Sequence, residues 1–367
     1  MDFDLTDEQE LLRDTTRDLL AGVYDVETRN RTVDTDPGWS REVWKQLADI
    51  GILSLGFDPA ESGQIEVMVV MTEIGRRLAP EPVAAAALVP GTLIAELGSD
   101  DQLLEQVGSG DMLLALAHRE PGTRGVFGSV TSTAAQQGNS WTITGRKHPV
   151  LAGDVADTLI VSAALPDSGG TGLFLVDAAA AERQPFRTFD GQRAAQIDFD
   201  ATPARPLGSG GDATEHLQRA LIRHQSALCA EAVGAMAEAL RLTTEYLPSR
   251  KQFGVPLSSF QTLTQRAADM YVSLELARSM NFWAAMSIAD GRFDPAVAAR
   301  AKLQICRSGR HIGQEAIQLH GGIGMTAEYP VGHYAARLTA IEQTLGSAHD
   351  QLQVLIDGLT GYDTVSL

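Results

Sequence analysis

The chain has 367 residues, of which 44% are hydrophobic and 21% are charged. This composition is typical of a water-soluble globular protein, and it argues against a disordered chain, a fibre or a disulfide scaffold. The formal net charge of −18 would repel a polyanion over much of the surface, so we expect no nucleic-acid partner.

Targeting and redox signals are also missing from the sequence. No apolar stretch reaches the eighteen or so residues that a membrane-spanning helix needs, and the first residues are acidic, unlike a secretion signal. Cys229 and Cys306 stand far apart without disulfide or metal-ligand spacing, so they are interpreted as small buried apolar residues. We therefore expect a cytoplasmic protein with no membrane segment and no metal site.

The first hundred or so residues carry helical patterns. Thr6 and Gln9 have the spacing of a reciprocal helix cap, and leucines at helical spacing then continue to about Gly22. Further helical patterns, separated by glycine and proline, cover 43–51, 66–78 and 84–97. These patterns predict an N-terminal helical domain over 1–110.

The pattern changes between about Met112 and about Phe199, where short apolar runs alternate with turn residues. Trp141 begins a short run of strand-forming residues directly after a Gln-Gly-Asn-Ser turn, as in the second arm of a hairpin. We predict a middle β domain over 111–205, closed by a hinge rich in proline and glycine over 202–211.

The last third carries four long segments with apolar residues at helical spacing. They cover 217–240, 263–277, 305–317 and 338–359. Four such helices with short connections predict an up-and-down four-helix bundle over 206–367. The expected fold class is α+β and mostly α, but fold alone does not give function.

The most informative segment, 250–261 (RKQFGVPLSSFQ), interrupts two of these helices at Gly254 and Pro256. Arg250 can make a bidentate contact to a phosphate, and Phe253 offers a flat face to a ring. An interhelix turn with a surface arginine would explain the same residues equally well.

A second segment, 318–331 (QLHGGIGMTAEYPV), is rich in glycine. Glycines let the backbone approach a ligand closely and expose amide donors. The alternative is a structural helix end, since Gly321 follows a clear helical pattern.

Together the two segments resemble the acyl-CoA dehydrogenase family, in which the first reads R-x-x-F-G followed by F/H-Q and the second Q-x-x-G-G-x-G followed by E-Y-P. The resemblance extends over the entire chain, including 4–9 (DLTDEQ), 119–122 (REPG) and 145–147 (GRK). It implies an N-terminal helical domain, a β-barrel-like middle, a C-terminal four-helix bundle, FAD as cofactor, an acyl-CoA substrate, and an electron-transfer flavoprotein or similar acceptor. The cofactor-binding residues that it implies are Arg250, Phe253, Phe260, Gln261, Gln318, Gly321 and Gly322.

The catalytic base of that family is a glutamate, which removes the α-proton of the acyl-CoA while a hydride leaves the β-carbon for the flavin. Counting from the E-Y-P motif places Leu345 at the usual position of this glutamate. In some members the base stands twenty-six residues before the arginine, where this chain has His224. We interpret His224 as a buried or ligand-lining histidine, and Glu342, one turn before Leu345, is the other nearby candidate. No catalytic residue is assigned to this chain.

The middle domain departs from the family as well. Members place T-E-P-x-x-G-S-D and W-I-T against their own flavin, whereas this chain has REPGTRG at 119–125 and HPVL at 148–151. Residues that the family presents across a subunit interface are thus retained, and those that serve the chain's own flavin are lost. This asymmetry predicts a hetero-oligomer in which a homologous partner holds the base and this chain alone is inactive.

Such pairs resemble the actinobacterial α2β2 acyl-CoA dehydrogenases that act on steroid side-chain CoA thioesters. Two alternatives stay open. The first is an active homo-oligomer that uses His224 or Glu342 as an unusual base, and the second is a non-enzymatic acyl-CoA-binding protein on a dehydrogenase fold.

Overall fold

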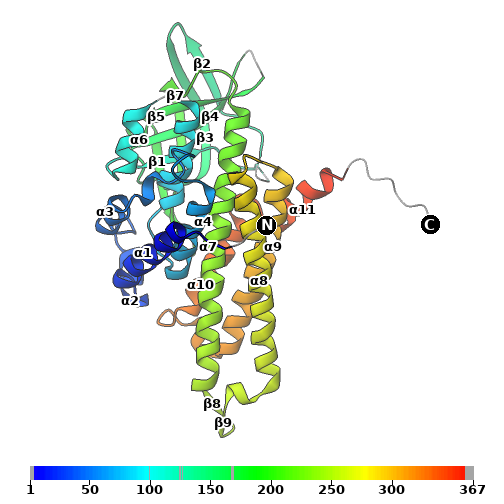
Figure 1. Ribbon diagram of the computed structural model, residues 1–367. Helices are drawn as coiled ribbons and strands as arrows, with labels where there is room; N and C mark the ends of the chain where they lie inside the picture. Colours follow the sequence, from blue (N-terminus) through cyan, green and yellow to red (C-terminus); the bar gives the residue numbers. More distant parts are fainter. Residues whose placement is uncertain (1–3, 99, 124, 126, 167–168, 360–367) are drawn as a thin grey trace, which may run out of the picture.

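The computed structural model describes residues 4–98, 100–123, 125, 127–166 and 169–359. Its described elements up to residue 108 are helices (Figure 1). They are α1 (Asp7–Val23), α2 (Val26–Asp34), α3 (Arg41–Asp49), the 3-10 turn η1 (Ile52–Ser54), α4 (Gln64–Arg77), the π turn η2 (Ala84–Leu88), α5 (Val89–Leu97) and α6 (Asp101–Gly108). The predicted cap of the first helix is confirmed: Thr6 N donates to Gln9 Oε1 at 3.0 Å, and Gln9 N donates to Thr6 Oγ1 at 3.3 Å.

Strands follow from residue 114 and build the middle domain. They are β1 (Leu114–Ala117), β2 (Thr133–Gln137), β3 (Ser140–Leu151), β4 (Thr158–Ala164), β5 (Thr171–Asp177), β6 (Glu182–Arg187) and β7 (Arg193–Pro206), with the 3-10 turn η3 (Ala178–Ala180) before β6. Pairings run from β2 to β3, β7, β5, β4 and back to β2, so the sheet closes on itself as a barrel. The predicted hairpin is confirmed, because Gln136 pairs with Trp141 across a tight turn.

The predicted hinge over 202–211 is wrong in its first half. Strand β7 continues to Pro206, which pairs with Phe174 of β5. A proline at this position is tolerated because it lies in the last residue of the strand, where a missing N–H costs little. Only the residues between β7 and the next helix form a connection.

The C-terminal part consists of long helices that run side by side (Figure 1). They are α7 (Thr214–Ser249), α8 (Gln261–Ala289), α9 (Pro295–His320), α10 (Val331–Gln343) and the short α11 (Ala348–Asp357). Between α7 and α8 lie the two-residue strands β8 (Lys251–Gln252) and β9 (Val255–Pro256) and the 3-10 turn η4 (Leu257–Ser259); a further 3-10 turn, η5 (Gly321–Met325), follows α9. The order of helices, barrel and helices confirms the predicted α+β, mostly α class, whereas the domain boundaries stay a prediction.

The fourth predicted helical segment, 338–359, is not one helix. Helix α10 ends at Gln343, and the backbone turns through positive φ angles at Leu345 (55°) and Gly346 (90°) before α11 begins. Ser347 caps α11 through a reciprocal hydrogen-bonded pair with Asp350. A strong cap directly after a glycine ends the first helix and starts the second, although the apolar spacing continues through both.

A close crossing of α4 and α7 fastens the N-terminal helices to the bundle. A Cβ added at Gly75 would lie 1.9 Å from the Glu231 carbonyl oxygen, and one at Gly234 would lie 1.8 Å from the Thr72 carbonyl oxygen. Only glycine fits at such distances, because two backbones occupy the space of a side chain. The crossing fixes α7 against the N-terminal domain and thereby positions the residues that α7 presents to the barrel. None of the described helices is long and apolar enough to cross a membrane.

Candidate active site

The first motif lies at the end of the bundle where α7 turns into α8. Arg250 follows the last residue of α7 and is exposed. Phe253 stands at the tip of the β8–β9 hairpin with a φ of 53° and is 93% exposed. The ring of Phe260 meets it edge-on at 6.3 Å, and the exposed Gln261 opens α8. These four side chains are presented to the surroundings of the chain.

The glycine segment lies at the same end of the bundle. Gln318 is exposed in the last turn of α9, and the space around Gly321 and Gly322 is open. Tyr246 of α7 stacks on His320 with ring centroids 4.5 Å apart, which holds the ends of the two helices together. The structure therefore brings both predicted motifs to one exposed end of the bundle (Figure 1).

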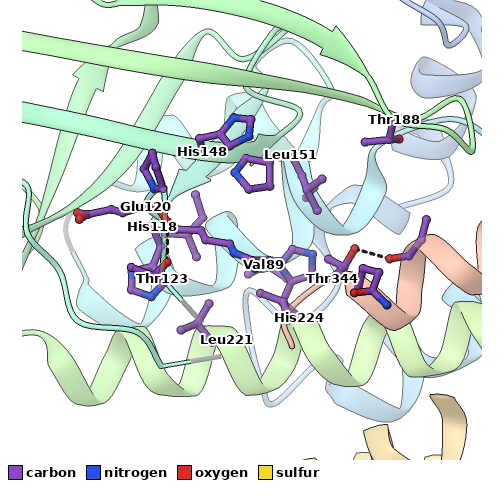
Figure 2. A pocket seen from close by; sticks show the side chains of 18 of the residues that line it. Val89, His118, Glu120, Thr123, His148, Leu151, Thr188, Leu221, His224 and Thr344 are labelled. Atoms are coloured by element: carbon purple, nitrogen blue, oxygen red, sulfur yellow. Dashed lines mark hydrogen bonds between the residues drawn. The ribbon is translucent and has the colours of Figure 1, made fainter. Parts of the chain in front are cut away.

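A cavity of about 500 Å³ lies between the barrel, α7 and the turn after α10 (Figure 2). Figure 2 shows His148 and Leu151 of β3 on one side of the cavity and Leu221 and His224 of α7 on the other. Arg250 follows His224 by 26 positions along α7 and its C-cap, which corresponds to about 39 Å at 1.5 Å per residue. The exposed end of the bundle that carries both motifs (the motif end) and the cavity are thus separate parts of the molecule.

Both positions that sequence counting assigned to the base line this cavity. Leu345 reaches it from the turn after α10, and His224 reaches it from α7. Glu342 does not line it, because its carboxylate forms an ion pair with Arg310 of α9. Although Glu342 precedes Leu345 by only three residues, the structure does not bring it to the cavity, since the helix ends between the two residues.

Two family models match the chain. The N-terminal domain of acyl-CoA dehydrogenases matches residues 6–107, and the C-terminal domain matches residues 215–359. The solved structure of a Tcur3481-Tcur3483 steroid ACAD variant is 32% identical, has a TM-score of 0.88, and is matched over 96% of this chain and 97% of its own. The chain belongs to the acyl-CoA dehydrogenase family.

Mycobacterial members of the family are similar over nearly their full length. Acyl-CoA dehydrogenase IpdE2 of Mycobacterium tuberculosis is 28% identical over 359 residues, which cover 95% of this chain and 96% of the relative. The ChsE4-ChsE5 complex of the same organism is 26% identical with a TM-score of 0.89, over 99% of this chain and 100% of that one. The family supports an oxidoreductase activity on CH–CH bonds.

In this acyl-CoA dehydrogenase chain two histidines that line the cavity, His224 and His118, have lowered pKa values. Burial, together with the nearby positive charges of Lys302 and Arg337, lowers the pKa of His224 to about 4. Burial likewise lowers the pKa of His118 to about 4, and its Nδ1 shares a hydrogen bond of 3.0 Å with Ser162 Oγ. A neutral imidazole whose conjugate acid is this strong is a weak acceptor for a proton.

Glu120 is the one carboxylate among the described residues that line the cavity, and it is fully engaged. Lys147, whose side chain is 0% exposed, donates to its Oε1 at 2.7 Å, and Thr131 and Ser132 donate from their backbone amides at 2.9 Å each. Burial favours the neutral acid, but these contacts outweigh it and hold the pKa of Glu120 below its usual value. Glu120 is therefore an anion in a structural ion pair, and it has no free oxygen for an α-proton.

Sequence reasoning named the segments that hold this ion pair but missed the pair itself. Lys147 occupies an inward position of β3, between the buried Ile143 and Val150. A lysine at an inward position of an alternating strand needs a buried counter-charge. The family-like segment 119–122 contains one carboxylate, that of Glu120. The inward position of Lys147 was therefore the signal that could have predicted the ion pair.

Proposed function

We propose that this chain is the base-lacking subunit of a heteromeric, FAD-dependent acyl-CoA dehydrogenase that desaturates an acyl-CoA between its α and β carbons. In this proposal its bundle end contacts the FAD of a homologous partner, and the partner supplies the catalytic glutamate. One observation carries the proposal. The exposed motif end is separate from the cavity, and among the described residues that line the cavity the one carboxylate, Glu120, is held in an ion pair.

The bundle end suits the phosphates of a dinucleotide that a neighbouring chain presents. Arg250 is exposed, and among the described residues none forms an ion pair with its guanidinium. The open space beside Gly321 and Gly322 lets a ligand approach the backbone closely, and Phe253 offers an apolar face. When bound, FAD supplies the acceptor of the substrate hydride.

The chain's own cavity suits such chemistry poorly. Removal of an α-proton needs a base of matched pKa beside the substrate, and Leu345 and the neutral His224 occupy the two base positions. His148 and Pro149 line the cavity, and the resemblance implies that they replace the family's ring-contacting residues. A complete site consequently requires residues from another chain.

The proposed partner and substrate rest on the relatives. The ChsE4-ChsE5 complex pairs two different components, and the Tcur3481-Tcur3483 protein is described as a steroid ACAD. Helix α8 supports this proposal with the large apolar residues Tyr271, Val272 and Leu276, each about half exposed. We propose a steroid side-chain CoA thioester as substrate, an α2β2 assembly, an electron-transfer flavoprotein or similar acceptor, and a cytoplasmic location.

Coexpression tests the proposal directly. The chain expressed alone is expected to be colourless or poorly soluble, and coexpression with a base-bearing homologue encoded nearby should give a yellow complex. Flavin absorbance against protein concentration should give fewer flavins than chains. A homotetramer of this chain with one flavin per chain would contradict the proposal.

Arg250→Ala tests the contact across the interface. Loss of a charge-assisted hydrogen bond to phosphate costs about 1.5 to 3 kcal/mol, so we expect FAD to dissociate roughly ten- to a hundredfold more readily from the purified complex. Arg300→Ala, which removes an exposed arginine from the opposite end of α9, is the matched control. Equal flavin retention in both variants would refute the assignment of Arg250.

One observation favours the homo-oligomeric alternative, because His224 does line the cavity. In that case the isolated chain would turn over an acyl-CoA, and His224→Gln would abolish the activity. If the chain is instead a non-enzymatic acyl-CoA-binding protein, it would bind CoA esters but bleach no flavin in any combination of chains.

A further inference from the structure

The chain's own cavity has the size and the lining of a binding site for a small organic molecule. Its volume of about 500 Å³ is within the range of pockets that hold such ligands. Its walls come from the barrel, α5, α7 and the turn after α10. The large apolar residues that line it are Val89, Leu116, Leu151, Phe189, Leu221 and Leu345.

The first feature of the cavity is a histidine whose proton position is fixed. Lys147 is fully buried and donates three hydrogen bonds. Its acceptors are His118 O at 3.1 Å, Glu120 Oε1 at 2.7 Å and Ser162 Oγ at 3.2 Å. Ser162 is 0% exposed, and within the described ranges its hydroxyl has one remaining acceptor, His118 Nδ1 at 3.0 Å. His118 Nδ1 therefore accepts this hydrogen bond, and the proton of the imidazole is on Nε2.

This N–H is accessible from the cavity. His118 lines the cavity (Figure 2), and its Nε2 has no hydrogen-bond partner among the described residues. In contrast to His148 Nδ1, which is buried without a partner, His118 Nε2 keeps accessible surface. Burial and the charge of Lys147 lower the pKa of His118 to about 4, so the ring is uncharged at pH 7. The cavity thus contains a neutral donor of fixed orientation.

The second feature is the pairing of the charges at the cavity. Apart from histidines, the described residues that line the cavity include two charged side chains, Glu120 and Arg119. Glu120 is held in its buried ion pair. Arg119 lies near Asp350 of α11: burial opposes ionisation of this carboxyl, but hydrogen bonds from Ser347 and the charges of His349 and Arg119 lower its pKa. Both lining charges thus have an opposite charge nearby, and a charged ligand would find none left for it.

The third feature is an apolar ring in the loop between β6 and β7. Phe189 lines the cavity and is 66% exposed. Its neighbours fix the loop. Thr188 Oγ1 donates to Gln192 O at 3.1 Å. The buried Asp190 accepts from Arg337 Nη1 at 2.8 Å. Phe189 therefore offers an apolar surface in a fixed position, which a ligand in the cavity can cover.

Since the proposed function, on which this inference rests, gives the cavity no catalytic step, we propose that it binds an uncharged, largely apolar molecule with a carbonyl oxygen. The oxygen accepts from His118 Nε2, and the apolar body covers Leu151, Leu221 and Phe189. A carbonyl is selected because a ligand without an acceptor would leave the Nε2 donor unpaired. A charged group is disfavoured because its transfer into apolar surroundings is costly without a free counter-charge.

Fluorescence titration of the full-length chain, in the assembly in which it purifies, tests the ligand class with three pyrenes of similar shape. 1-Acetylpyrene has the carbonyl, 1-ethylpyrene lacks it, and pyrene-1-carboxylate carries a charge in its place. We expect 1-acetylpyrene to bind at one site per chain, about fivefold more tightly than 1-ethylpyrene, as one hydrogen bond predicts, and about tenfold more tightly than the carboxylate. Equal affinities for the acetyl and ethyl compounds, tightest binding of the carboxylate, or displacement of 1-acetylpyrene by an equal concentration of octanoyl-CoA overturns the proposal.

Variants locate the bound probe. His118→Phe keeps a ring and removes the donor, so it should abolish the preference for 1-acetylpyrene and leave the affinity for 1-ethylpyrene unchanged. Phe189→Ala should weaken binding of both compounds about fivefold, because it removes apolar contact area. Leu11→Ala, which removes another largely exposed apolar side chain, in α1, is the control and should change neither affinity.

His118→Phe also releases Ser162, so Phe189→Ala, at an exposed position, provides the second test. A preference for 1-acetylpyrene that persists in His118→Phe, or wild-type affinities in Phe189→Ala, refutes the site. Flavin absorbance of the same samples tests the proposed function, and the probe affinities are measured independently of it. Failure of the one is therefore distinguishable from failure of the other.

Discussion

Glu81 gives the chain a pH-dependent stability that a single substitution can expose. The residue is 3% exposed, and Tyr24 and the Ser40 amide both donate to its Oε1. Its Oε2 is buried without a partner among the described residues. Burial raises the pKa of Glu81 from 4.5 to about 7, although the two hydrogen bonds oppose this rise. Glu81→Gln removes the ionisation while it keeps the size of the side chain and an acceptor for Tyr24 and Ser40.

The sign follows from proton binding. Between pH 4.5 and 7 the folded chain holds the Glu81 proton that the unfolded chain has released, so the free energy of unfolding falls as pH rises. The stabilising contribution is complete below pH 4.5 and is lost as pH passes 7. A pKa difference from 4.5 to about 7 corresponds to a loss of about 3 kcal/mol. The charged groups that line the small chamber beside Glu81 are Asp190, Arg193, Glu231 and Arg337.

Urea denaturation of the wild type and of Glu81→Gln at pH 5, 6, 7 and 8 measures this effect. The difference in free energy of unfolding between the two proteins should be small at pH 5 and should favour the variant by about 3 kcal/mol at pH 8. Taking the difference cancels the titration of all other groups. Tyr24→Phe should move the fall to higher pH, since it removes a hydrogen bond that stabilises the carboxylate. A difference that stays constant from pH 5 to 8 would refute the reasoning.

Three further variants probe the packing and the buried charges. Gly234→Ala should prevent folding, because its Cβ would lie 1.8 Å from a backbone oxygen of α4. Circular dichroism and the yield of soluble protein measure this effect. Gly22→Ala, at a position where the space is open, is the control that should fold. Lys147→Met should cost about 3 to 5 kcal/mol by leaving Glu120 charged and buried, and added Glu120→Gln should recover much of it in urea denaturation; no recovery would contradict the ion-pair explanation. His224→Gln should reduce the fall in free energy of unfolding between pH 6.5 and 4, because the lowered pKa of the buried imidazole costs the wild type stability as pH falls through this range. If both proteins lose the same free energy of unfolding over this range, His224 is protonated in the folded chain.

Local sequence signals predicted much of the fold. The Thr6 and Gln9 cap and the Gln136–Trp141 hairpin were predictable because the groups that satisfy each other lie within a few residues. The end of β7 and the break at Leu345 were missed for the opposite reason. At the end of β7 the prolines and glycines indicated a hinge, but pairing with β3 and β5 extends the strand to Pro206. At Leu345 the apolar spacing continued, but the cap at Ser347 starts a new helix. Tertiary contacts and short caps override local sequence patterns.

Predictions of the candidate site succeeded and failed for the same reasons. Sequence counting assigned Leu345 and His224 to the two positions that the family uses for its base, and the structure brings both residues to one cavity. It could not foresee that Glu342 would turn to Arg310, because the end of α10 sets that direction. The roles of the seven cofactor-binding residues stay predictions, since their ligand lies outside the chain. Exposure at one end of the bundle is what the chain itself contributes to that assignment.

The geometry also bears on which partner can complete the site. A ligand held at Arg250 would lie about 39 Å along α7 from His224, so on the proposed function Arg250 serves a cavity in another chain. A second copy of this chain would bring the same Leu345 and the same neutral His224 to that cavity. On the proposed function, an assembly of two such copies would therefore have two sets of phosphate contacts but no carboxylate base at either position. On the proposed function, only an unlike chain with a glutamate at one of these positions turns the shared cofactor into a catalytic site.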